Sequence, residues 1–251
     1  MSPEALFWTA AVGAAVVSGV SKGGFAPGAG FLATPMLALT SEPAIAAAVM
    51  LPLLCLMDLF AVRSFWGLWD ARQVKSMALG ALAGVGAGWA AFHHLDADSL
   101  RLMLGALALG FVVWNLVKGR LKPRPAVFSA KRAGFWGALA GFASFSAHAG
   151  GPPATIHLLS QNLDKTRFQS TMAAFFAFAN LIKLPPYAAL GLFRADVLTM
   201  ALVLAPLAPL SVWAGAWAHR RLSDRWFFGL TQMCLLGAGL KLVWDGAGLG
   251  G

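Results

Sequence analysis

Hydrophobic residues follow one another in long runs from one end of the chain to the other. Six runs are uninterrupted, at residues 43–62, 73–94, 99–118, 168–190, 195–219 and 226–246. A helix rises about 1.5 Å per residue, so a run of about 20 residues crosses the roughly 30 Å hydrocarbon core of a bilayer. The pattern therefore predicts an all-α, polytopic membrane protein.

Two further runs, residues 4–39 and 133–160, are interrupted near their middle. The stretch from Ser18 to Pro35 holds one lysine, five glycines and two prolines, and glycine and proline break helices. Within lipid, a broken backbone survives only where protein or a water-filled cavity satisfies its N–H and C=O groups. A lysine within the membrane, as Lys22 would be, is energetically unfavourable unless an oppositely charged or polar partner binds it. A broken helix with a buried cation is typical of an anion site in a membrane transporter.

The composition excludes a soluble protein. The chain is 59% hydrophobic and 12% charged, whereas soluble domains carry about 25% charged residues. We attribute the net charge of +9 to basic cytoplasmic loops rather than to nucleic-acid binding. Cys55 and Cys234 lie alone in hydrophobic runs, which favours small core residues over a metal site or a thiol relay.

The two halves of the chain resemble each other. Trp8, Gly13, Ser18 and Gly23 recur 128 positions later as Trp136, Gly141, Ser146 and Gly151. Met50 and Asp58 recur 122 positions later as Met172 and Asn180. We expect an N-terminal repeat over 1–119, a basic linker over 120–132 and a C-terminal repeat over 133–251. Each repeat would be an interrupted unit followed by three transmembrane helices, and such repeats are common in secondary transporters.

Basic residues indicate how the halves are oriented. If each interrupted run is a re-entrant hairpin, 14 loop lysines and arginines face the cytoplasm and 2 face outward. If each run crosses once, the split is 10 against 6. Because cytoplasmic loops are rich in Lys and Arg, the hairpin is favoured. The repeats are then inverted, the linker is cytoplasmic and both termini face away from the cytoplasm.

The two hairpin tips should meet near the membrane midplane, where inverted-repeat transporters bind substrate. Backbone N–H groups at glycines, helix N-termini and hydroxyls all suit an oxyanion. The expected anion-binding residues are Ser18, Ser21, Lys22, Gly23 and Gly24 in the first tip, Ser146, Gly150 and Gly151 in the second, and Asn180 and Lys183 on the helix after it. His148 and Asp58 are candidates for carrying a coupled proton, since histidine titrates near neutral pH.

Each assignment has a simpler alternative. The glycines can serve close helix packing, and Lys22 can extend to a membrane interface. His148 can be a hydrogen-bonded core residue, and Asp58 can simply neutralise a lysine.

The sequence contains no pattern that indicates an enzyme. We find no Ser-His-Asp arrangement in suitable context, no zinc-protease motif and no Walker loop. We therefore expect no cofactor and no metal. The expected partners are a small anion, protons and the lipid bilayer, with an oligomer left open, and uphill transport would draw on an ion gradient.

The glycine-rich segments of the two halves resemble the TauE/SafE sulfite-exporter family. The segments contain Gly19, Gly23, Gly24, Gly28, Gly30 and Pro35 in the first half, and Gly141, Gly150, Gly151 and Pro152 in the second. The resemblance covers nearly the whole chain. It implies export, or in some members uptake, of sulfite, organosulfonates or related anions across a bacterial inner membrane, driven by the proton gradient.

Two other functions are compatible with the same residues. A passive anion channel would use the same site but show no coupling to pH. A non-transport membrane protein, such as an assembly factor, would move no anion.

Overall fold

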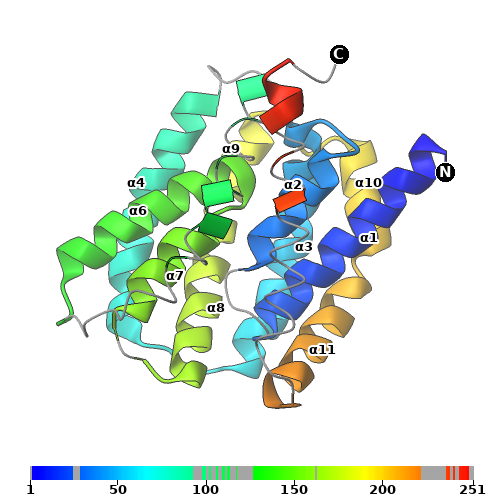
Figure 1. Ribbon diagram of the computed structural model, residues 1–251. Helices are drawn as coiled ribbons and strands as arrows, with labels where there is room; N and C mark the ends of the chain where they lie inside the picture. The colour runs from blue at the N-terminus through cyan, green and yellow to red at the C-terminus, as the bar shows by residue number, and fades with distance from the viewer. Residues whose placement is uncertain are drawn as a thin grey trace.

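A computed structural model gives the fold of the chain (Figure 1). It describes residues 2–24, 29–92, 127–161 and 163–221, together with separate positions between 98 and 117 and between 236 and 248. All regular structure in these residues is helical, which confirms the all-α prediction. Most of the predicted runs 99–118 and 226–246 lies outside the described residues.

The first interrupted run forms a helix that stops and a short segment that turns back. Helix α1 (Pro3–Lys22) begins at Ser2, whose Oγ accepts a hydrogen bond from the N–H of Ala5 at 3.2 Å. After the break, the 3₁₀ turn η1 (Ala29–Leu32) leads into α2 (Ala33–Ala38). In Figure 1, α1 descends from the upper right and α2 lies back in the upper half. The chain thus returns toward the side of its N-terminus.

The second interrupted run has the same plan. Helix α6 (Ala130–Ala147) ends at His148, and α7 (Gly151–Leu159) follows after a short turn. His148 has φ 51°, the only positive φ of a residue other than glycine among the described positions. A left-handed residue at this place ends a helix and satisfies its last carbonyls. The amide N–H of Ala149 accordingly donates to the carbonyl of Ala143 at 3.1 Å.

Two predicted spans are continuous helices in the structure. Helix α3 (Pro43–Ser64) matches the predicted run 43–62, and α4 (Ala71–Phe92) matches 73–94 to within two residues at each end. Asp70 caps α4, since its Oδ1 accepts from the N–H groups of Arg72 and Gln73 at 3.0 and 3.1 Å.

The next two predicted spans are broken, and this differs from the prediction. Residues 168–190 form α8 (Lys165–Leu181) and α9 (Leu184–Ala189), separated at Lys183. Residues 195–219 form α10 (Ala195–Leu204) and α11 (Leu207–Arg221), with a bend of 42° between them. Prolines explain both breaks, because proline lacks an N–H and clashes with the preceding turn. Pro185 and Pro186 follow the first break, and Pro206 lies in the second.

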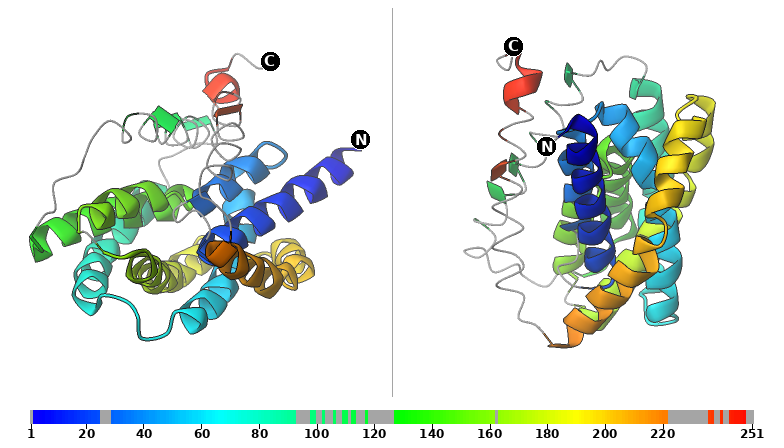
Figure 2. Two further views of the ribbon diagram at one scale, coloured as in Figure 1. Left: turned by 60° about the horizontal axis from the view of Figure 1, so that its bottom comes forward. Right: turned by 90° about the vertical axis from the view of Figure 1, so that its right-hand side faces the viewer.

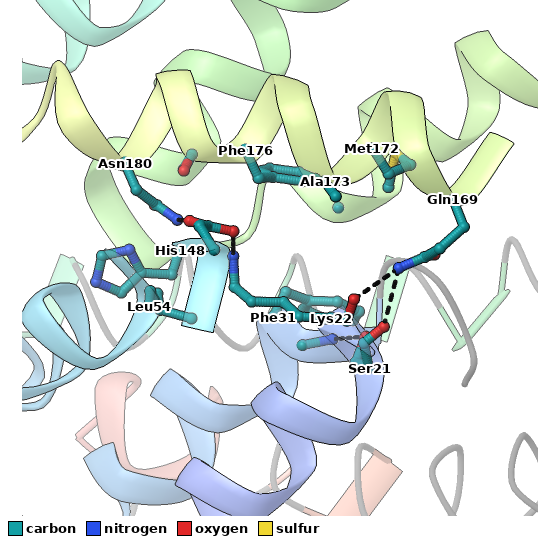
Figure 3. Close-up of a pocket in the computed structure, with 14 residues that line it drawn as sticks. Ser21, Lys22, Phe31, Leu54, His148, Gln169, Met172, Ala173, Phe176 and Asn180 are labelled. Atoms are coloured by element: carbon teal, nitrogen blue, oxygen red, sulfur yellow. Dashed lines mark hydrogen bonds and ion pairs between the residues drawn. The ribbon is translucent and has the colours of Figure 1, made fainter. Parts of the chain in front are cut away.

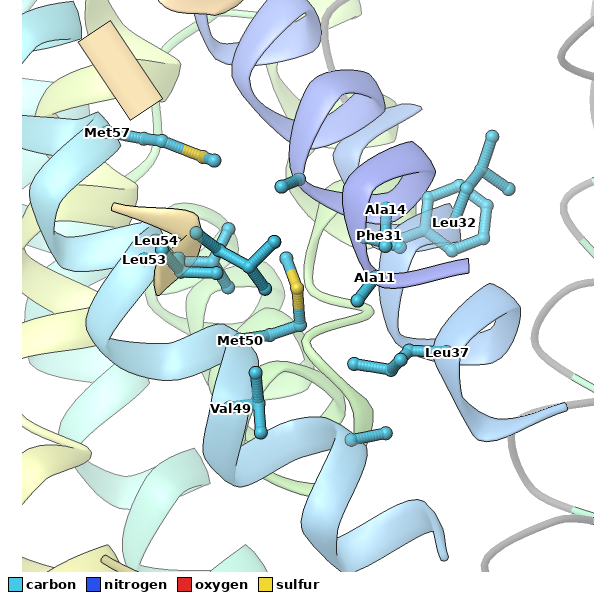
Figure 4. Close-up of a cluster of buried hydrophobic side chains, with 14 of the residues drawn as sticks. Ala11, Ala14, Phe31, Leu32, Leu37, Val49, Met50, Leu53, Leu54 and Met57 are labelled. Atoms are coloured by element: carbon cyan, nitrogen blue, oxygen red, sulfur yellow. The ribbon is translucent and has the colours of Figure 1, made fainter. Parts of the chain in front are cut away.

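Helices α1 and α3 are each long and apolar enough to cross a membrane, and the bent pair α10–α11 is a third candidate among the described residues. Side chains of α3 also form much of the largest buried cluster (Figure 4). There Met50, Leu53 and Met57 pack with Ala11 and Ala14 of α1. This packing fixes α1 beside the middle of α3.

The two halves of the chain are interleaved. Helix α6 of the second half lies along α4 of the first, and α1 of the first half lies along α11 of the second (Figure 2). Glycines allow both approaches. A Cβ at Gly84 would clash with the carbonyl of Ala138, and one at Gly23 would clash with the carbonyl of Val212. Small residues are the usual means by which membrane helices come this close.

Candidate functional site

A cavity lies between the break that follows α1 and the break between α6 and α7 (Figure 3). Its volume is about 60 Å³. Its wall is formed by the ends of α1 and α6, the start of α7, and parts of η1, α3 and α8. Six of the residues predicted from the sequence line it, namely Ser21, Lys22, Asp58, His148, Gly151 and Asn180.

The centre of the wall is a charged network around Asp58 on α3. The Nζ of Lys22 forms an ion pair with Oδ1 of Asp58, and Nδ2 of Asn180 donates to Oδ2 at 2.5 Å. Figure 3 shows the side chains of Lys22 and Asn180, with dashed lines for these two contacts. Asp58 and Asn180 are both 2% exposed. A buried carboxylate requires such partners, because an unpaired buried charge is very costly.

Lys22 is therefore not a free cation in this structure. The simpler alternative, in which Asp58 neutralises a lysine, fits the Lys22–Asp58 ion pair of this structure. However, the Lys22 side chain is 14% exposed against 3% for Asp58, and its Nζ lies 5.7 Å from the centroid of the Phe176 ring. The ammonium thus remains at the cavity surface while it holds the carboxylate.

A second network surrounds Lys183, which lies in the break between α8 and α9 and is fully buried. Its Nζ donates to the carbonyl of Ser144 at 3.1 Å, to Oγ of Ser144 at 3.0 Å and to Nδ1 of His148 at 2.7 Å. An ammonium has three N–H bonds to donate, so all of them are used. Lys183 does not line the cavity, and its contacts assign it to holding the tip of α6 in position.

The hydrogen bonds of His148 fix its protonation. Nε2 lies 2.9 Å from the carbonyl oxygen of Ala47, and a carbonyl can only accept, so Nε2 carries a hydrogen. Nδ1 faces the ammonium of Lys183 and therefore accepts. His148 is consequently neutral whenever Lys183 is charged, and the two side chains share one proton between them.

The serines of the first tip bind the backbone of the returning segment. Oγ of Ser18 donates to the carbonyl of Gly30 at 3.2 Å, and the N–H of Gly30 donates to Oγ of Ser21 at 2.9 Å. Both backbone polar groups of Gly30 are thus satisfied inside the hairpin, as burial requires. Ser18 does not line the cavity, whereas Ser21 does.

Four more predicted residues also have places outside the cavity wall. Gly23 packs against α11, and Gly24, with φ 105°, accepts through its carbonyl a hydrogen bond from Nδ1 of His219 at 2.5 Å. Gly150 packs against the carbonyl of Ala140, and Oγ of Ser146 bonds within α6 to the carbonyl of Phe142 at 3.2 Å. Packing of the hairpins accounts for these residues in the present geometry.

The wall also contains two polar residues outside the expected anion site: Ser144, which the sequence places in the second hairpin tip, and Gln169, which the sequence did not single out. Nε2 of Gln169 on α8 donates to the carbonyl of Lys22 at 2.8 Å, while its buried Oε1 has no hydrogen-bond partner among the residues that the structure describes. Gln169 thus fixes the last turn of α1 from the other half of the chain. No pattern in the sequence around Gln169 signals this contact, since it joins positions 147 residues apart.

The donors that gather here suit an anion rather than a cation. Among the described residues, no group of three or more His, Cys, Asp or Glu side chains could hold a metal ion. The wall instead combines the ammonium of Lys22, the amide of Asn180 and Gly151 at the N-terminus of α7. Helix N-termini attract anions through their unpaired N–H groups. In α7 the donor is Gly151, because Pro152 and Pro153 have no N–H and the N–H of Ala154 donates to the carbonyl of Gly150 at 3.3 Å.

The sequence profile of the family described as "Sulfite exporter TauE/SafE" matches residues 11–242. The chain belongs to this family. The match includes the break after α1, the break between α6 and α7, and every residue named above for the cavity wall. No curated protein and no solved structure matches the chain. TauE/SafE proteins are membrane permeases, and the apolar helices of this chain agree with that role.

Proposed function

We propose that this TauE/SafE protein is a secondary transporter that exports sulfite or an organosulfonate, with the cavity between the two breaks as its binding site. The observation that carries the proposal is the position of Lys22: a cation at the cavity surface, at the end of a broken helix, beside the N-terminal end of α7. Broken helices near the midplane are the usual binding elements of secondary transporters.

The size of the cavity suits such a substrate. A cavity needs about 15 Å³ to hold one water molecule. The 60 Å³ of this cavity would therefore hold roughly four water-sized groups. Sulfite consists of one sulfur and three oxygen atoms. Ser21, Lys22, Asn180 and Gly151 would contact the anion directly. Ser18, Gly23, Gly24, Ser146, Gly150 and Lys183 would support these contacts from behind the wall.

We propose that the two halves, residues 1–119 and 133–251, are inverted repeats joined by the basic linker 120–132. The reciprocal packing of α1 on α11 and of α6 on α4 supports this. So does the hydrogen bond between Asn180 and Asp58, which occupy equivalent places in the two halves. Alternating access would then come from rocking of the two halves around the fixed site.

We further propose that the protein lies in the bacterial inner membrane with the linker in the cytoplasm. The upper end in Figure 1, where α1 begins, would face away from the cytoplasm. Arg63, Arg72 and Lys165 flank the opposite end of the helices, as the positive-inside rule requires of the cytoplasmic side. Proton coupling would use Asp58 or the His148–Lys183 pair.

Flux into vesicles that contain the purified protein tests the proposal. The panel is sulfite, sulfoacetate, taurine, thiosulfate, sulfate and lactate, each with and without a pH gradient. We expect saturable flux of a sulfur oxyanion or sulfonate that responds to the gradient. Lys22→Gln should reduce the apparent affinity at least tenfold, since it removes the only charge offered to the anion by the described wall. Lys75→Gln, on the exposed part of α4, is the matched control.

The other outcomes have distinct meanings. Unchanged affinity in Lys22→Gln would show that the anion binds elsewhere. Saturable flux of lactate alone would keep the mechanism and reject the sulfur substrate. Flux that ignores the pH gradient would identify a channel or uniporter, and no flux of any anion would reject transport.

A further inference from the structure

The ion pair between Lys22 and Asp58 determines how anion and proton binding affect each other. Asp58 is the partner of the ammonium that the proposed anion needs, so anion and carboxylate compete for it. We infer that an anion binds only when Asp58 takes up a proton, and that one proton and one monovalent anion cross together as an electroneutral symport. The inference rests on the proposed function and assigns its coupling to Asp58. Because the bacterial cytoplasm is alkaline relative to the outside, such a symport exports the anion while the outward concentration ratio of the anion exceeds the inward ratio of protons.

The charge in the cavity wall explains why the two ligands bind together. In the empty site, the positive charge of Lys22 and the negative charge of Asp58 cancel. With a monovalent anion bound and Asp58 protonated, Lys22 and the anion cancel instead. Anion alone leaves one uncompensated negative charge, and proton alone leaves one positive charge. An unpaired charge within a membrane protein is strongly unfavourable, so only the empty and doubly loaded sites are suited to change sides.

The hydrogen bonds around Asp58 permit this exchange. On binding, the carboxylate takes a proton from water on the side to which the cavity is open, and the ammonium of Lys22 passes from Oδ1 to the anion. Nδ2 of Asn180 can keep its bond to Oδ2, because a protonated carboxyl still accepts through its other oxygen. On release, the anion leaves, Lys22 returns to Oδ1 and the proton goes to water on the other side.

The other charged groups near Asp58 do not alter this balance. Lys183 and His148 face the region from the α8–α9 break and from α6. They share one proton, so the pair carries one positive charge, which is the same in the empty and the loaded site because Lys183 does not line the cavity and all its N–H bonds are used. Cys55 is on α3 itself. Helices α10 and α11 also pack on α3; their Asp196 pairs with Arg194 at 2.5 Å, and their His219 bonds to Gly24. η1 and α2 have no titratable side chain. Lys22 is thus the charge that responds to Asp58.

The direction of coupling can be measured in vesicles with methanesulfonate, whose single charge does not change with pH, and with sulfite in parallel. An electroneutral symport accumulates the anion on the alkaline side, up to about tenfold per pH unit. It ignores a membrane potential, whereas a uniporter would accumulate a monovalent anion about fiftyfold at 100 mV. A pH dye inside the vesicles should report acidification as the anion enters. Protein-free vesicles give the passive background.

Asp58→Asn separates the coupling from the transport itself. With Lys22 permanently free, this variant should still exchange internal for external anion, with an affinity that no longer changes with pH. It should lose accumulation driven by the pH gradient, because its empty site keeps an unpaired charge. Asp196→Asn, an exposed aspartate at the start of α10, is the matched control and should behave as the wild type.

Each other result has one meaning. Accumulation on the acidic side, or inward anion flux with outward proton flux, would overturn symport in favour of antiport. Accumulation driven by the potential alone would overturn electroneutrality. Gradient-driven accumulation retained in Asp58→Asn would move the proton site away from Asp58. If that variant does not fold, the wild-type measurements still decide the direction. No movement of either anion by the wild type would overturn the proposed function together with this inference.

Discussion

Asn180 donates a hydrogen bond of 2.5 Å to Asp58, although the two residues are 122 positions apart and occupy corresponding places in the two halves of the sequence. Residues related by a pseudo-two-fold axis can touch only where they lie close to that axis. The contact therefore supports the inverted-repeat arrangement and would put the cavity at its centre. In the second half an amide takes the place of the acid, so the two equivalent positions hold one negative charge between them.

Replacing Asn180 by leucine should shift the pH dependence of transport. The amide of Asn180 stabilises the ionised form of Asp58, and a hydrogen bond to a charged group is worth about 1.5–3 kcal/mol. Without it, Asp58 should take up a proton at higher pH. Since one pH unit corresponds to about 1.4 kcal/mol, the pH of half-maximal flux should rise by about one to two units. The measurement is initial flux of methanesulfonate, whose charge does not change with pH, against pH.

Two results would count against this role of Asn180. If the pH profile of Asn180→Leu is unchanged, Asp58 does not set it. If the profile keeps its midpoint while the maximal flux falls, Asn180 acts on the anion alone. Leu181→Ala, at an exposed neighbouring position on α8, controls for unspecific effects on the helix.

Lys183→Met should destabilise the protein more than it affects substrate affinity. The substitution removes three hydrogen bonds and leaves Oγ of Ser144 and Nδ1 of His148 without these partners in a buried place, while the carbonyl of Ser144 keeps the N–H of His148 at 3.0 Å. Unsatisfied buried groups cost about 1–3 kcal/mol each when their partner is removed. We expect a total loss of about 2–4 kcal/mol, since the tip can partly relax. Thermal unfolding of the purified protein in detergent measures this.

The exposed Lys75 on α4 provides the comparison. Lys75→Met should change stability by less than about 0.5 kcal/mol, as surface substitutions usually do. A Lys183→Met protein that is as stable as the wild type but binds the anion weakly would instead make Lys183 a direct ligand.

Gly84→Ala and Gly86→Ala should have opposite effects although both lie on α4. A Cβ at Gly84 would clash with the carbonyl of Ala138 on α6, whereas a Cβ at Gly86 would meet no atom within 4 Å. Overpacking of this kind costs about 1–3 kcal/mol. In an open place, alanine favours a helix over glycine by up to about 1 kcal/mol. Unfolding midpoints of the two variants measure the difference, and equal midpoints would show that α4 and α6 do not pack as the structure has them.

The sequence predicted the parts of the site that depend on local chemistry. Lys22 and the breaks were found because glycine, proline and a charge stand out against apolar neighbours. Asp58 and Asn180 were found because the repeat pairs them. The bend between α10 and α11 could have been predicted from Pro206. It was not, because Pro206 lies within the continuous hydrophobic run 195–219. Uninterrupted hydropathy indicates burial in lipid and does not report where the helix axis changes.

Contacts between distant parts of the chain could not be predicted. Gln169 looks like an ordinary polar residue until α8 lies beside the end of α1. Likewise, nothing in the sequence distinguishes Ser144 from Ser146, two residues later. Ser144 lines the cavity, whereas the hydroxyl of Ser146 donates to the carbonyl of Phe142 in the same helix. Which of the two serines faces the cavity depends on the rotation of α6, and this is fixed by its packing against α4.

Labelling of single cysteines should reveal which side of the membrane each end of the helices faces. Glu42 lies in the turn before α3, near the end where α1 begins, and Val127 is 89% exposed just before α6. In a background of Cys55→Ala and Cys234→Ala, a membrane-impermeant maleimide applied to right-side-out vesicles should label Glu42→Cys. It should label Val127→Cys only after the membrane is permeabilised. This follows from the 14 basic residues that the hairpin arrangement directs to the cytoplasm. The reverse pattern would invert the orientation, and labelling of both sites from outside would mean that the predicted runs 43–62, 73–94 and 99–118 do not all cross the membrane.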